Sequence, residues 1–159
     1  MSALRISSLV VAWVLLVFAC LAMAGSWYTI SFTGSGMTVS YSYTLKELAD
    51  ESDSEQLKFI DAAFACSCVA LASAVLGACA NTAGFFLSEK RKIGFTLGAV
   101  FSLLVAVTSI VAFGIFANNM KPYMSDSSKY GWGFGLQFLV FLFGIGNTVL
   151  SILAARDKS

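Results

Sequence analysis

The chain has 159 residues, of which 58% are hydrophobic and only 12% are charged, and its formal net charge is +1. A soluble domain carries roughly a quarter charged residues, so a soluble fold of this composition would lack the polar side chains to cover its surface. A nearly neutral chain without histidine also offers no basic surface for nucleic acid and lacks the commonest general base and metal ligand. The composition therefore indicates an integral membrane protein.

The charged residues bound four uncharged apolar stretches, at 6–25, 62–87, 93–117 and 130–155. Each has at least the roughly 20 residues that a helix needs to cross a bilayer, whereas the strands of a membrane β-barrel are about 10 residues long and alternate. We predict an all-α membrane protein, with a small outer antiparallel β-hairpin or sheet, that forms a single tetraspan domain over 1–159. Its transmembrane helices are expected at about 6–25, 57–87, 93–117 and 130–155, with outer loops at 26–56 and 118–129.

The basic residues predict the orientation. Four spans place both termini and the loop between the second and third helices on one side, which carries six basic and two acidic residues. The other side carries four basic and seven acidic residues. Because basic loops stay inside, we expect cytoplasmic N- and C-termini, in the plasma membrane.

The first span has a second interpretation. Arg5, the apolar run and Ala22-Met23-Ala24 also fit a cleavable signal peptide. The run is longer than the usual apolar region of such a peptide, which favours a retained helix.

Alternation in the first outer loop predicts a β-hairpin. Apolar residues alternate with serine and threonine on both sides of Gly34-Ser35-Gly36, first at Tyr28, Ile30 and Phe32 and then at Met37, Val39, Tyr41 and Tyr43. Period-two runs joined by a glycine-containing turn are typical of hairpins. We expect the apolar face to pack on the outer ends of the helices or on a partner, since an isolated hairpin is marginally stable.

Two capping-box spacings follow the hairpin. Thr44-Leu45-Lys46-Glu47 predicts a short helix at about 45–50, and Ser52-Asp53-Ser54-Glu55 predicts the start of the second span. An acidic outer cluster surrounds this junction: Asp50, Glu51, Asp53, Glu55 and Asp61. It fits either a solvated face at a helix N-terminus or a weak cation site or docking patch for a basic partner. In the second loop, 125–128 reads as a turn.

Inside the spans, small and polar residues predict helix packing. Small residues recur every four positions at Gly94, Gly98 and Ser102, and Gly131 and Gly135 form a G-x-x-x-G pair. Gln137 and Asn147 are expected to make interhelical hydrogen bonds. Aromatic residues at both outer helix ends are expected at the membrane interface, namely Trp27, Tyr28, Tyr130 and Trp132.

The sequence contains no recognisable catalytic motif. Apart from Asp61 at a boundary, the spans hold no ionisable acid or base, which argues against a pump, an active transporter or a hydrolase. The four cysteines all fall in spans and read as packing residues. We predict no enzyme activity, no catalytic residue, no cofactor and no metal site.

The layout resembles the claudin and peripheral-myelin-protein superfamily of tetraspans. The likeness rests on a long β-rich first outer loop, a short second one, Trp27 after the first helix, and the segment 129–136 that opens the fourth. The family's W-GLW-C-C hallmark has no counterpart between Ser26 and Phe59. The resemblance therefore implies the architecture rather than sealing or pore formation. A MARVEL-type tetraspan is the second possible relative.

These observations predict a non-enzymatic structural or adhesion protein, or an auxiliary subunit, that acts through its β-rich outer loop and lipid-facing helices. The partner-contact candidates are Tyr28, Ile30, Phe32, Val39, Tyr41, Tyr43, Phe138 and Phe141. The expected partners are membrane lipid and another membrane protein or a second copy, with no nucleic acid. The alternative is a small oligomeric channel or passive pore with Asp61 and the acidic cluster at its mouth.

Overall fold

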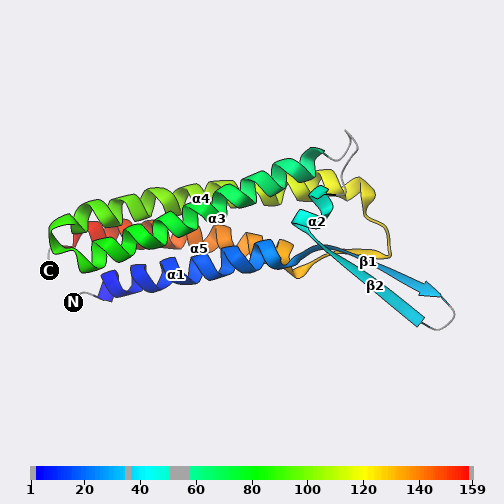
Figure 1. The fold of residues 1–159 in the computed structure, drawn as a ribbon, viewed down its shortest axis with the longest axis horizontal. Coiled ribbons are helices and arrows are strands. Elements are labelled where there is room, and N and C mark those ends of the chain that lie inside the picture. The colour runs from blue at the N-terminus through cyan, green and yellow to red at the C-terminus, as the bar shows by residue number, and fades with distance from the viewer. Residues whose placement is uncertain (1–2, 35–36, 51–57, 158–159) are drawn as a thin grey trace.

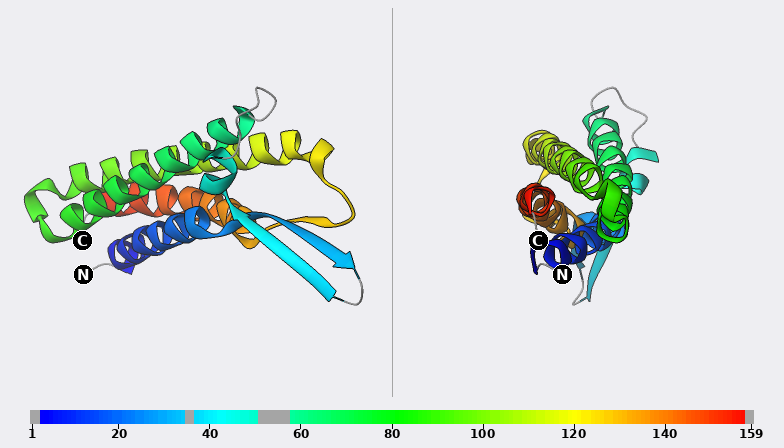
Figure 2. Two further views of the ribbon diagram at one scale, coloured as in Figure 1. Left: turned by 45° about the vertical axis from the view of Figure 1, so that its right-hand side comes forward. Right: turned by 90° about the vertical axis from the view of Figure 1, so that its left-hand side faces the viewer.

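Four long helices form the body of the protein, which is described by a computed structural model over residues 3–34, 37–50 and 58–157. They are α1 (Ala3–Ala24), α3 (Lys58–Phe86), α4 (Arg91–Met120) and α5 (Trp132–Arg156), and they lie side by side (Figures 1 and 2). Each is long and apolar enough to cross a membrane, which confirms the prediction of four helices of transmembrane length. The start of α1 and the end of α5 lie together at what we call the terminal end of the bundle (Figure 1).

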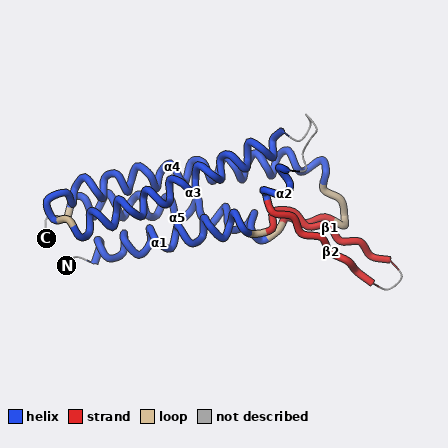
Figure 3. Tube along the Cα trace, in the orientation of Figure 1, coloured by secondary structure: helices blue, strands red, loops and turns tan. Residues whose placement is uncertain are grey.

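A three-stranded antiparallel sheet lies at the opposite end, which we call the sheet end (Figure 3). Its strands are β1 (Ser26–Gly34), β2 (Met37–Thr44) and β3 (Ser128–Tyr130), in the order β2-β1-β3. The hairpin β1–β2 was predicted, and its register pairs Tyr28 with Tyr43, Ile30 with Tyr41 and Phe32 with Val39. β3 was not predicted, because three residues are too few to show alternation.

The short connections follow their local signals. The helix α2 (Leu45–Asp50) begins at the predicted capping box, where the Thr44 backbone N–H donates to Glu47 Oε2 over 2.7 Å and the Glu47 N–H donates to Thr44 Oγ1 over 3.3 Å. The Thr44 hydroxyl also donates to Glu47 Oε2, over 2.9 Å. The two bonds that Glu47 Oε2 accepts from Thr44 lower the pKa of the Glu47 carboxyl, the backbone bond most. Single 3-10 turns, η2 (Ser88–Lys90) and η3 (Lys121–Tyr123), adjoin the two ends of α4. The second predicted capping box, 52–55, lies outside the described residues.

Small residues allow the helices to approach closely. Gly94, Gly98 and Ser102 are all buried in α4, and a Cβ added at Gly94 would overlap the backbone of Gly84 in α3. The fourth helix differs from its prediction: the space around Gly135 is open, and Gly133 is the residue packed against Gly25. Gly131 lies against the Ser26 carbonyl, beside the start of β1. Gly131 precedes α5 in an extended conformation, and Gly133 and Gly135 lie on different sides of the helix. Spacing alone does not identify which of the two helical glycines is packed.

Polar side chains link all four helices in the half of the bundle near the terminal end. Asn147 Nδ2 donates to Ser102 Oγ over 2.6 Å, which is an interhelical bond of the predicted kind. Ser151 Oγ donates to Asn81 Oδ1 over 3.3 Å and lies 2.9 Å from Ser8 Oγ. Gln137 is also buried, but its Nε2 atom has no hydrogen-bond partner among the described residues.

An aromatic cluster joins the sheet to the bundle. Trp27 is fully buried at the start of β1, and its indole N–H donates to the Ala22 carbonyl over 2.8 Å. Its ring meets Phe116 and Phe134 edge-on, at centroid distances of 5.1 and 5.8 Å. The Trp27 ring therefore turns inward between α1, α4 and α5 and packs against protein, which the prediction of an interfacial aromatic residue did not anticipate. Tyr130 and Trp132, by contrast, are exposed.

Candidate interaction surface

The distal half of the β1–β2 hairpin presents one apolar face. Cross-strand pairing places Phe32 opposite Val39, and the Phe32 and Tyr41 rings meet edge-on at 6.3 Å between centroids. These side chains remain 60%, 49% and 54% exposed for Phe32, Val39 and Tyr41, and Met37 is 76% exposed. We call these four residues the apolar hairpin face. An exposed cluster of this kind marks a contact site more often than a scattered apolar residue does.

The other face of the hairpin is a ladder of hydroxyl groups. Three directly opposed pairs lie within hydrogen-bond distance, namely Thr29 and Ser42 at 3.1 Å, Ser31 and Ser40 at 2.9 Å, and Thr33 and Thr38 at 3.2 Å. Such cross-strand pairs stabilise a sheet and fix its register. The ladder therefore holds the apolar residues on the opposite side of the ribbon.

The hairpin also has an outer edge, along β2, that no strand of the described residues pairs with. β2 is an outer strand of the sheet, and β3 pairs with β1 only from Tyr28 to Ile30. One further bond, from the Ser31 N–H to the Ser127 carbonyl, extends this contact by a residue. Beyond it the ribbon is two-stranded and projects away from the helices (Figure 1). An edge with unpaired backbone groups can accept another strand.

The structure divides the predicted hairpin contacts into two groups. Tyr28 is buried and its hydroxyl donates to Ser128 Oγ over 2.9 Å, so Tyr28 belongs to the sheet base rather than to an open surface. Ile30 and Tyr43 are half-buried against the aromatic cluster. Only Phe32, Val39 and Tyr41 lie open. Met37 was not among the predicted contact residues, although its place in the same alternation identifies it.

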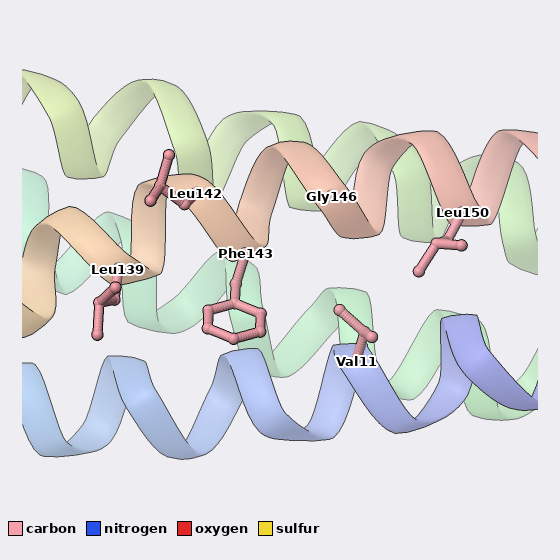
Figure 4. Close-up of a pocket in the computed structure, with 6 residues that line it drawn as sticks. All are labelled: Val11, Leu139, Leu142, Phe143, Gly146 and Leu150. Atoms are coloured by element: carbon pink, nitrogen blue, oxygen red, sulfur yellow. The ribbon is translucent and has the colours of Figure 1, made fainter.

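The surface of α5 forms a second apolar region. Phe138 is exposed, and its ring lies 5.8 Å from that of the half-buried Phe141. A shallow groove of about 380 Å³ runs between α5 and α1 (Figure 4), and its lining residues are Val11, Leu139, Leu142, Phe143, Gly146 and Leu150. Every lining residue is apolar, as expected for a helix surface that faces lipid tails.

The acidic outer cluster is described only in part. Asp50 is exposed at the end of α2 and Asp61 is exposed in the first turn of α3. Glu51, Asp53 and Glu55 lie outside the described residues. The cation-site hypothesis therefore stays a prediction.

Comparison with known proteins adds no relative to this description: the chain matches no protein-family model and no curated protein.

Proposed function

We propose that this protein is a non-enzymatic tetraspan that acts by protein–protein contact, as a structural or adhesion protein or as an auxiliary subunit. The apolar hairpin face carries the proposal. Three large side chains and Met37 are held on one side of a ribbon that extends past the bundle, where no other described segment covers them. Interfaces gain most of their affinity from a few such side chains, often aromatic, that become fully desolvated.

The charge distribution supports an outward-facing hairpin. Among the described residues, the terminal end carries five basic residues (Arg5, Lys90, Arg91, Lys92 and Arg156) against two acidic ones (Glu89 and Asp157). The sheet end carries four basic residues against four acidic ones, so the excess of positive charge lies at the terminal end. Since basic segments stay on the cytoplasmic side, we place the termini in the cytoplasm and the sheet outside, at the plasma membrane. The partner in this proposal is another membrane protein or a second copy, and the open β2 edge supports strand addition as the contact mode. We also propose a distant relationship to the claudin-like superfamily, on the layout and residues given above.

Site-specific photo-crosslinking of the full-length protein in its native membrane tests the contact. A photoreactive residue at Val39 reports on the apolar hairpin face, and the same residue at the neighbouring Ser40 reports on the hydroxyl face. We expect a discrete crosslinked product from position 39 and little from position 40. Equal products from both positions, or none from position 39, would contradict the proposal.

A passive pore formed by several copies is the second candidate. One observation favours it: Asp61 is exposed on the outer surface of α3 rather than inside the bundle, so it could line a path only between copies. Reconstituted protein should then conduct ions, and Asp61→Asn should abolish the conductance. Under the contact proposal the reconstituted bilayer shows no conductance.

A further inference from the structure

A positively charged cleft lies at the terminal end of the bundle, between the start of α4 and the end of α5. It measures about 450 Å³ and is lined by Arg91, Lys92, Ala155, Arg156 and Asp157. The one acid, Asp157, forms an ion pair with Arg5 at 3.3 Å. Together, the lining of the cleft and the ion-pair partner of its acid comprise four cationic side chains and one acidic side chain, a balance that favours an anion.

The position of two of these cations strengthens the argument. Arg91 and Lys92 open α4, a helix of 30 residues with no acidic residue in its first turn and no side-chain cap. The N-terminus of a helix carries the positive end of its dipole, so cations there are unfavourable and an anion is stabilised. A bound anion would offset both the dipole and the crowded positive charge.

The cleft continues into an apolar groove along α4. Lys92 borders both, and the groove of about 230 Å³ is completed by Ile93, Thr96 and Leu97. A further shallow groove follows on the same helix, lined by Val100, Leu103, Leu104 and Val107. From Ile93 to Leu104 the helix rises about 16 Å. One leaflet of the hydrocarbon core is about 15 Å deep.

We propose that this region binds an anionic phospholipid. Its phosphate occupies the cleft, where Arg91, Lys92 and Arg156 supply the positive charge, and one acyl chain follows the groove on α4. The continuity of a cationic cleft with an apolar groove selects an amphipathic ligand over free phosphate. The proposal depends on the helices spanning a membrane but not on the role of the hairpin.

Native mass spectrometry of the full-length protein in mild detergent tests this assignment. The probes are dioleoyl phosphatidylglycerol, dioleoyl phosphatidylcholine with the same chains, and soluble glycerol 3-phosphate. We expect retention of phosphatidylglycerol well above phosphatidylcholine and no retention of glycerol 3-phosphate. Each cation removed should weaken phosphatidylglycerol binding about fivefold, so the pair Arg91→Gln and Lys92→Gln should weaken it about 25-fold.

The matched control removes the same charge at the sheet end, through Lys121→Gln and Lys129→Gln, and should leave binding unchanged. If the first double variant does not fold, Arg156→Gln alone should still weaken binding about fivefold. Equal weakening by both double variants would overturn the site, because it would reflect net charge alone. Equal retention of the two lipids would also overturn it, and retention of glycerol 3-phosphate would overturn the choice of a lipid.

Discussion

A close approach of α3 and α4 at Gly94 leads to a stability prediction. Gly94 of α4 faces Gly84 of α3 near the terminal end, and a Cβ added at Gly94 would lie 2.8 Å from the Ala80 carbonyl oxygen and closer still to the Gly84 Cα. Those atoms belong to backbone, which cannot rotate aside. Gly94→Ala therefore forces α3 and α4 apart, and these two helices share the most extensive contact between the described helices.

The size of the effect follows from two opposed contributions. Overpacking by one methyl group in a well-packed interface costs about 1–3 kcal/mol. Replacing glycine with alanine inside a helix stabilises the folded state by about 0.5–1 kcal/mol, which offsets part of that cost. We expect a net loss of about 1–2 kcal/mol in the free energy of unfolding.

Gly114 provides the matched control on the same helix, because no atom lies within 4 Å of a Cβ added there. Gly114→Ala should be neutral or stabilise by up to about 1 kcal/mol. The assay is reversible unfolding of the full-length protein in mixed micelles, titrated with a denaturing detergent and followed by circular dichroism. Equal shifts for the two variants would refute the assignment of Gly94 to the helix contact.

Three further predictions concern the sheet end. Trp27→Phe removes the indole N–H that donates to the Ala22 carbonyl, together with part of a buried ring. Thermal unfolding should therefore show a loss of about 1–3 kcal/mol in the free energy of unfolding. A smaller loss would contradict the burial of the indole. The Glu47 carboxylate accepts hydrogen bonds from Thr44, which lower its pKa in the folded protein. The stability that this cap contributes is therefore present at neutral pH and is lost as the pH falls below the ordinary carboxyl range. Carboxyl NMR should show a Glu47 midpoint below 4.5 that rises in Thr44→Ala, and an unshifted midpoint would contradict the cap. Tyr28→Phe removes the hydrogen bond to Ser128 and should lower the free energy of unfolding by about 1 kcal/mol, with no effect on partner binding. An effect on binding without a loss of stability would instead show that Tyr28 belongs to the contact surface.

Much of the fold is predictable because its signals are local. Hydropathy locates the four helices, alternation locates the β1–β2 hairpin, and the spacing from Thr44 to Glu47 locates the start of α2. Each signal lies within a window of a few to about twenty residues. The limits of α4 were less accurate: its helix continues to Met120, beyond the apolar stretch that ends at Ala117.

The remaining features depend on contacts between segments far apart in the sequence. β3 exists because it pairs with β1, a hundred residues earlier, rather than through any pattern of its own. An aromatic residue at a helix end fits the interface rule at Trp27 and Trp132 alike, and only tertiary packing buries the first and exposes the second. Likewise, Gly133 and Gly135 are equivalent in spacing, and the position of Gly25 selects Gly133.

The candidate surface shows the same division. Alternation identifies which residues share the apolar hairpin face, but it does not say how far the bundle covers them. The structure shows that the base of the ribbon is covered, at Tyr28, and that the tip is open, at Phe32 and Tyr41. Half of the six hairpin residues predicted to contact a partner are therefore exposed, namely Phe32, Val39 and Tyr41.

The most direct test of the contact proposal is a comparison of two double variants by size-exclusion chromatography with light scattering after extraction in mild detergent. Phe32→Ser with Tyr41→Ser alters the apolar hairpin face, and Ser31→Ala with Ser40→Ala alters the hydroxyl face at adjacent positions. We predict that the wild type and the hydroxyl-face variant elute as a complex, and that the apolar-face variant elutes as a monomer of unchanged thermal stability. A wild-type protein that elutes as a lone monomer, or an apolar-face variant that keeps the complex, would contradict the proposal.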